Sequence, residues 1–224
     1  MKAAQREPNK NNADEHPEPE LSFFHEKDCN MPKTCNLSRA PTVSRSSWDN
    51  SLDIISRVDL HRPAANFELP DLQGRFHRLS DYRGDIVILN FWSAECPHSE
   101  RTDRYLTDLV EKRNGEVVLL SIAPNRNESI QMLEEAATTR RLPVVLIDAE
   151  LVVADLYEAQ TTPHAFVIDK EGILCYRGAV DDVTFRQRKA SRFFLEETVE
   201  ALLNGRLPEL AEMPAYGCTI VREI

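Results

Sequence analysis

The chain has 224 residues and a formal net charge of −10 at pH 7. This length allows one domain with a full hydrophobic core and additional segments. The negative charge argues against a nucleic-acid partner, and no stretch approaches the ~18 consecutive apolar residues of a membrane span. The N-terminus lacks the apolar core of a secretory signal, so the sequence predicts a cytoplasmic protein, with export as the open alternative.

Residues 1–47 contain no glycine, few large apolar side chains, and many charged, asparagine and proline residues. Such a segment buries too little apolar surface to offset the entropy lost on ordering, so we expect a disordered N-terminal extension. We interpret its cysteines, Cys29 and Cys35, as incidental, with a metal clip that also uses His25 as the alternative. Residues 48–61 are predicted to form a linker or a short docking helix.

Apolar strands alternate with amphipathic helices over residues 62–210, and residues 211–224 form a C-terminal tail. A hairpin-like lead-in precedes strand 86–92, whose apolar residues on both faces indicate a sheet covered by helices on both sides. This pattern predicts an α/β domain, with Asn127 as the N-cap of its second helix. The predicted strands are 86–92, 116–123, 144–148, 164–168 and 173–176, and the predicted helices are 97–113, 128–140, 150–159 and 193–204.

Cys96 follows the end of strand 86–92, and Pro97 suits the first position of a helix. The unpaired N–H groups and the dipole of a helix N-terminus favour a thiolate over a thiol. A thiolate is the nucleophile in disulfide exchange and in peroxide reduction. We therefore predict that Cys96 is the catalytic nucleophile, the alternative being a small buried hydrophobic residue.

Two neighbours of Cys96 carry further predictions. Ser99 stands where a dithiol oxidoreductase has its second cysteine, so Cys96 cannot form a Cys-x-x-Cys disulfide. We expect the Ser99 hydroxyl to donate a hydrogen bond to the thiolate, or to be a polar residue of the first turn. A protonated His98 would lower the pKa of the thiol, and the alternative is an exposed histidine without a catalytic role.

Cys218 is the candidate resolving cysteine, because Gly217 gives the tail the freedom to fold over the site. The alternative is that Cys218 only packs the tail against the domain. Cys175 lies in the middle of a predicted strand and is interpreted as buried packing. Arg177 follows the same strand, and either it reaches the rim of the site or Asp181 and Asp182 cap the next segment.

Four motifs occur in a fixed order along residues 62–224: Cys96-Pro97-His98-Ser99, Thr162-Pro163 before an apolar strand, Arg177-Gly178-Ala179-Val180-Asp181-Asp182, and Gly217-Cys218. Together they resemble the thioredoxin superfamily, specifically its redoxin branch of the alkyl hydroperoxide reductase/thiol-specific antioxidant (AhpC/TSA) type. The resemblance implies a thioredoxin fold, a central mixed β-sheet flanked by helices on both faces. It also implies that Pro163 follows Thr162 through a cis peptide bond and packs against Cys96.

The resemblance further implies a thiol-based oxidoreductase in which Cys96 attacks disulfides or oxidised sulfur species. Its partners would be such a substrate and an external thiol reductant, and no cofactor or metal is expected. One alternative is a thiol peroxidase, although Leu89 replaces the proline of that motif and Arg177 falls two residues late. The others are an interaction protein with vestigial chemistry and a metal-binding module that uses Cys96, His98, His164 and Cys218.

Overall fold

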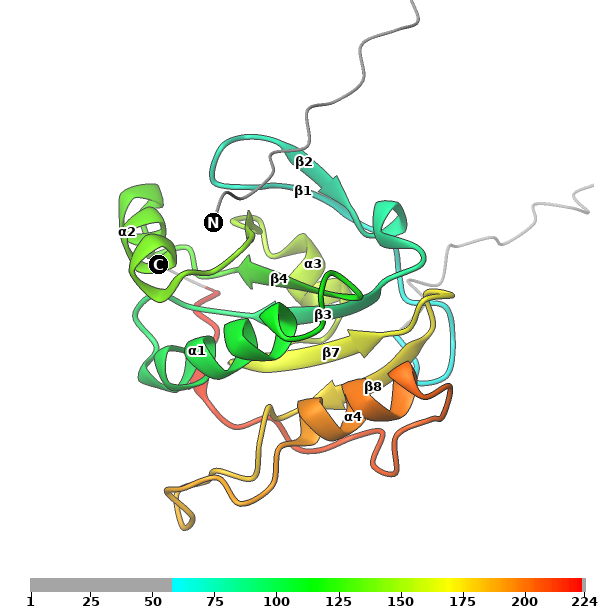
Figure 1. The fold of residues 1–224 in the computed structure, drawn as a ribbon. Coiled ribbons are helices and arrows are strands. Elements are labelled where there is room, and N and C mark those ends of the chain that lie inside the picture. The colour runs from blue at the N-terminus through cyan, green and yellow to red at the C-terminus, as the bar shows by residue number, and fades with distance from the viewer. Residues whose placement is uncertain (1–57, 223–224) are drawn as a thin grey trace, which may run out of the picture. The chain divides into compact units, whose positions relative to one another are not determined.

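The computed structural model describes residues 58–222. Its centre is a five-stranded sheet in the order β5-β4-β3-β7-β8, with β3, β4 and β5 parallel and β7 and β8 antiparallel to their neighbours (Figure 1). The strands of this sheet are β3 (Ile86–Phe91), β4 (Val117–Ala123), β5 (Val145–Ile147), β7 (His164–Ile168) and β8 (Leu174–Gly178). The expected mixed sheet is confirmed.

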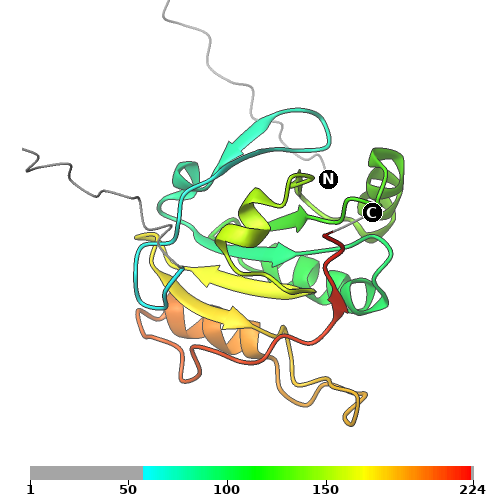
Figure 2. The same ribbon diagram turned by 180° about the vertical axis from the view of Figure 1, so that it is seen from behind.

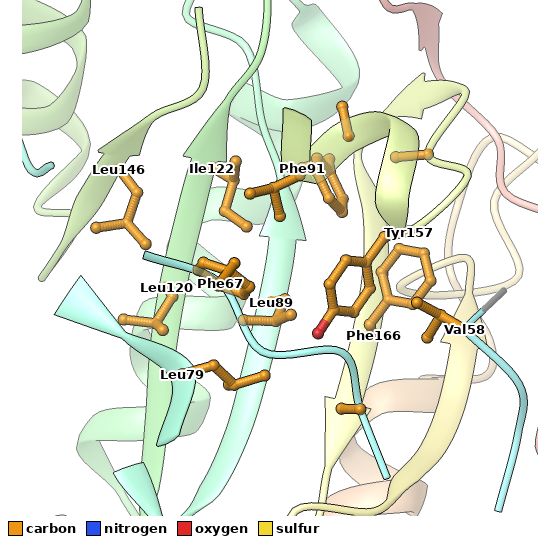
Figure 3. Packing of buried hydrophobic residues seen from close by; sticks show 14 of the residues in the cluster. Val58, Phe67, Leu79, Leu89, Phe91, Leu120, Ile122, Leu146, Tyr157 and Phe166 are labelled. Atoms are coloured by element: carbon orange, nitrogen blue, oxygen red, sulfur yellow. The ribbon is translucent and has the colours of Figure 1, made fainter. Parts of the chain in front are cut away.

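Helices cover both faces of this sheet, as the apolar pattern of β3 predicts. Alternate residues of β3 point to opposite faces: Leu89 packs in one cluster with Tyr157, and Ile88 packs in another with Leu106. Figure 3 shows the first cluster, where Leu89, Phe91 and Phe166 surround the Tyr157 ring. The helices are α1 (Pro97–Glu111), α2 (Ile130–Arg140), α3 (Val152–Leu156) and α4 (Phe194–Leu203), and β1 (Glu68–Pro70), β2 (Phe76–Arg78) and the 3-10 turn η1 (Leu79–Tyr82) form the lead-in.

The start of α2 differs from the prediction. The N-cap is Ser129, whose hydroxyl accepts a hydrogen bond from the Met132 N–H at 3.2 Å. Asn127 was expected in this role, but its side chain donates instead to Glu95 at 2.9 Å. The prediction of Asn127 as the cap is therefore wrong: residues 127 and 128 belong to the turn before the helix, and their side chains bind the loop that precedes Cys96.

The predicted helix 150–159 is shorter in the structure. Leu151 has a φ of 61° and Glu158 a φ of 53°, and this left-handed backbone cannot continue a right-handed helix. Only Val152–Leu156 is helical. The released chain then forms a short strand that the sequence pattern did not predict, β6 (Thr161–Thr162).

The C-terminal tail is part of the folded domain. The Met213 N–H donates to the Arg177 carbonyl beside β8, and β9 (Cys218–Thr219) pairs antiparallel with β6. Figure 2 shows this last segment, in red, running back along the edge of the molecule. Ile220 is 2% exposed and belongs to the main core. The tail thus crosses the end of the sheet where Cys96 lies.

The predicted disordered extension and most of the predicted linker lie outside the described residues. At the first described position, Val58 is buried in the core. Within residues 58–222, every helix is too short or too polar to cross a bilayer.

Candidate active site

Cys96 is the N-cap of α1, and Pro97 occupies the first helical position. This confirms the placement expected from the strand, cysteine and proline sequence. The Cys96 side chain is 2% exposed, and its backbone N–H donates to the Ser93 hydroxyl at 3.1 Å. The sulfur therefore lies beside the free N–H groups of the first turn, shielded from bulk water.

The Cys96 sulfur has two close partners from distant parts of the chain. Its Sγ lies 2.6 Å from the Sγ of Cys218, and both residues are free thiols. The Cys96 thiol also donates to the Thr162 carbonyl at 2.9 Å. A disulfide has an S–S length of about 2.05 Å, so a small movement is enough to join the two sulfurs.

The Thr162–Pro163 peptide bond is cis, as the resemblance implies. This bond presents the Thr162 carbonyl to Cys96, and Thr162 is also the register partner of Cys218 in the β6–β9 pair. Two residues of the same short strand pair thus meet at the thiol. The proline loop and the tail position the two cysteines together.

The two thiols differ in acidity. Burial raises the pKa of Cys96, but hydrogen bonds from the Cys218 thiol and from the Ser99 backbone N–H outweigh it, and the net pKa is lowered. Burial and the neighbouring Cys96 sulfur raise the pKa of Cys218 to about 11. Cys96 is therefore the more acidic of the two thiols and loses its proton before Cys218. This is the arrangement that a nucleophilic thiolate requires.

Ser99 and His98 reach the sulfurs through their backbones. The Ser99 N–H hydrogen bonds Cys96, whereas the Ser99 hydroxyl is buried without a partner among the described residues. The predicted hydrogen bond from that hydroxyl to the thiolate is therefore wrong for this structure. The His98 N–H points to Cys218, and the His98 ring packs edge-on against Tyr216 with a centroid distance of 5.0 Å. The first turn of α1 thus contacts both sulfurs.

The loop before Cys96 depends on a buried carboxylate that sequence reasoning missed. Oε1 of Glu128 accepts hydrogen bonds from the Ser93 hydroxyl at 2.7 Å and from the Glu95 N–H at 2.9 Å. Because the Ser93 hydroxyl in turn accepts from Cys96 N–H, Glu128 holds the strand-to-helix turn in place. The only sequence signal was an acidic residue at the predicted start of the second helix, 128–140.

His164 is partly buried directly after the cis-proline loop. Its ring packs against Phe166 with a centroid distance of 4.6 Å, and burial lowers its pKa to about 4. In the part of the chain that the structure describes, no three His, Cys, Asp or Glu residues are grouped so as to hold a metal ion. The predicted set of Cys96, His98, His164 and Cys218 is thus not assembled as a metal site here, and Cys29 and Cys35 lie outside the described residues.

The charged residues at and after the end of β8 bind the tail, α1 and a nearby loop. Arg177 hydrogen bonds Glu212 at 2.7 Å, which ties β8 to the tail. Asp181 is buried and accepts two hydrogen bonds from Arg101 of α1, at 2.6 and 3.1 Å. Asp182 accepts hydrogen bonds from Ser191 instead of capping a helix. Asp181 also accepts a hydrogen bond from the Val183 N–H at 3.0 Å, as a cap of the segment that follows it. The capping alternative therefore holds for Asp181 but not for Asp182.

Cys175 is fully buried in β8, which confirms its interpretation as packing. Burial, with the nearby Asp169 carboxylate, raises its pKa to about 12. Such a thiol is inert as a nucleophile.

A mixed sheet in this strand order, with a cysteine at the N-terminus of α1 and a cis-proline loop against its sulfur, defines a thioredoxin-fold protein. The sequence matches the AhpC/TSA family over residues 60–177, more than half of the chain. The chain belongs to this family.

Curated relatives include two proteins named thiol-disulfide oxidoreductase ResA. The protein of Geobacillus thermodenitrificans is 36% identical over 112 residues, and that of Geobacillus kaustophilus is 37% identical over 112 residues. Each match covers 49% of this chain and 63% of the relative. The chain therefore spans less than two thirds of the length of these relatives.

Two solved structures are similar over most of their length. A hypothetical protein of Sinorhizobium meliloti has a TM-score of 0.67 and 26% identity, with 73% of this chain and 94% of that chain covered. An uncharacterized conserved protein of Geobacillus kaustophilus has a TM-score of 0.68 and 24% identity, with 75% and 94% covered. At this level of identity the second likeness shows the fold alone.

Proposed function

We propose that this protein is a thiol-disulfide oxidoreductase in which Cys96 is the nucleophile and Cys218 the resolving cysteine. The observation that carries the proposal is the 2.6 Å separation of the two sulfurs, with the more acidic thiol at the N-terminus of α1. The family and the names of its curated relatives support the reaction class. The partners are a disulfide or another oxidised sulfur substrate and an external thiol reductant.

The first step is attack by the Cys96 thiolate on a substrate disulfide. A new S–S bond forms between Cys96 and one substrate sulfur, and the other substrate sulfur leaves with the electron pair. The N–H groups of α1 stabilise the attacking thiolate before this step. Because Cys96 is 2% exposed, the tail that carries Cys218 must move aside when a bulky substrate arrives.

In the second step Cys218 attacks the Cys96 sulfur of the mixed disulfide. The Cys96–Cys218 bond forms and the substrate sulfur leaves as the reduced product. Part of the raised pKa of Cys218 comes from the neighbouring Cys96 sulfur. That negative charge is absent in the mixed disulfide, so Cys218 becomes easier to deprotonate when it is needed.

The test is peptide mapping of disulfides after one equivalent of a disulfide substrate. We expect the wild-type chain to contain a Cys96–Cys218 disulfide, and Cys218→Ser to accumulate a mixed disulfide on Cys96 and to lose multiple turnover. The matched control is Cys175→Ser, which removes a buried cysteine away from the site and should leave turnover unchanged. Free Cys218 in oxidised protein, with turnover unaffected by Cys218→Ser, would contradict the proposal and favour a packing role.

A further inference from the structure

A groove of about 370 Å³ lies beside the two cysteines. It is lined from three directions: Pro97, His98 and Arg101 of α1, Phe185 and Arg188 of the loop after β8, and Tyr216 of the tail. The groove is linked to the site through His98, which lines the groove and whose backbone N–H hydrogen bonds Cys218. The His98–Tyr216 ring contact connects the α1 wall and the tail wall.

The lining of the groove combines an apolar surface with positive charge. Phe185 is 78% exposed although it is a large aromatic residue. Arg101 is already paired with Asp181, whereas Arg188 forms no hydrogen bond or ion pair with any other residue in the described part of the chain. Among residues 58–222, no acidic side chain lines the groove. In a protein of net charge −10, this is a local site for an anion that has an apolar portion.

The two cysteine residues differ in their exposure. Cys96 is buried, and Cys218 is partly exposed. After the two form a disulfide, an external thiol reaches Cys218 first. The volume of the groove is in the range of small-molecule sites.

We propose that the groove binds a small thiol that carries carboxylate groups, and that this thiol reduces the Cys96–Cys218 disulfide by attacking Cys218. The proposal rests on the proposed function, because it requires that disulfide. Arg188 provides the charge that receives a carboxylate, and Phe185 covers the apolar part of the bound molecule.

The reduction balances with two thiol molecules. The first, as a thiolate, forms an S–S bond with Cys218, and the Cys96–Cys218 bond breaks with its electron pair on Cys96. The second attacks the sulfur of the first, releases a small-molecule disulfide and leaves Cys218 reduced. Of the two protons that the thiols bring, Cys218 takes up one, and the other goes to solvent while Cys96 is a thiolate. The acidities agree with this direction, because the sulfur of lower pKa is the better leaving group and that sulfur is Cys96.

The experiment measures how fast the preformed disulfide of the full chain is reduced by glutathione, which carries carboxylates, and by 2-mercaptoethanol, which is uncharged. We expect Arg188→Gln to lower the rate constant with glutathione by about two- to fivefold, the range of an exposed ion pair, and to leave that with 2-mercaptoethanol unchanged. The matched control is Arg186→Gln, which removes an exposed arginine of the same loop that does not line the groove. It should change neither rate.

The inference would be overturned if Arg188→Gln and Arg186→Gln lowered the rate constant with glutathione equally. It would also be overturned if Arg188→Gln lowered the rate constants with glutathione and with 2-mercaptoethanol equally. A second measurement does not depend on the stability of the loop. When the reaction is quenched with acid at early times, glutathione should be found on the Cys218 peptide. Glutathione on the Cys96 peptide would overturn the inference. If Cys96 and Cys218 form no disulfide at all, the proposed function itself is wrong, and this outcome is distinct from a failure of the groove to bind the thiol.

Discussion

Gly217 lies directly against the backbone of Thr162. A Cβ atom placed on Gly217 would come within 2.1 Å of the Thr162 carbonyl oxygen and 2.6 Å of its carbon. Because the contact is with backbone, no side-chain movement relieves it. The next residue along the tail is Cys218, so the absence of a side chain at position 217 is what lets the two cysteines meet.

Gly217→Ala should therefore move the tail away from the cis-proline loop and separate the cysteines. We expect slower formation of the Cys96–Cys218 disulfide. We also expect faster alkylation of Cys96 at a pH high enough to ionise its thiol fully, because the sulfur becomes more exposed and the loss of the Cys218 hydrogen bond does not then change the thiolate fraction. Disulfide mapping over time and peptide-resolved alkylation measure the two effects. Thr219→Ala is the control, since it changes an exposed residue of the same strand. Disulfide formation as fast in Gly217→Ala as in wild type would contradict this role.

Cys218→Ala should raise the pKa of Cys96. The Cys218 thiol donates one of the hydrogen bonds that hold this pKa below its ordinary value, and alanine cannot replace it. The measurement is the pH dependence of Cys96 alkylation, followed by mass spectrometry of the Cys96 peptide. The midpoint should shift upward toward the ~8.5 of a free cysteine. A midpoint that stays the same would show that the helix N-terminus alone determines the acidity.

Ser93→Ala should lower the free energy of unfolding by about 1–3 kcal/mol, because it leaves the buried Cys96 N–H without its acceptor and removes one of the two hydrogen bonds to the Glu128 carboxylate. Denaturant unfolding measures this change. Ser121→Ala is a matched control: Ser121 is also buried, but its hydroxyl has no partner in the described structure. Its removal should cost little. Equal losses in both variants would argue against the Ser93–Glu128 connection.

His164 should make the stability of the protein depend on pH. Burial lowers the pKa of this ring to about 4, below its unfolded value of about 6.5. A histidine with a lowered pKa binds protons more weakly in the folded state, so its contribution is complete above pH 6.5 and is lost as the pH falls toward 4. We expect His164→Phe to lose less unfolding free energy than wild type between pH 6.5 and 4, by about 1–3 kcal/mol. Parallel stability curves for the two proteins would contradict this.

Much of the domain could be predicted from local signals. The apolar run of β3, the thiol after it and Pro97 together specify a cysteine at a helix N-terminus, because strand burial and helix initiation depend on neighbouring residues. The same holds for Cys175, whose place within an apolar strand predicts its burial. Local signals were less reliable at the start of α2, where both Asn127 and Ser129 suit a cap. The packing of Glu128 against the loop before Cys96 decides between them.

The tertiary structure determines which cysteine lies close enough to Cys96 to form a disulfide with it. The sequence by itself determined that Ser99 cannot resolve a disulfide and that Cys218 was available, but the two cysteines are 122 positions apart in the chain. Their contact depends on the β6–β9 pairing and on the close approach of Gly217 to Thr162. Such long-range backbone contacts arise only when the tail packs on the finished sheet, and no local pattern of residues encodes their distance.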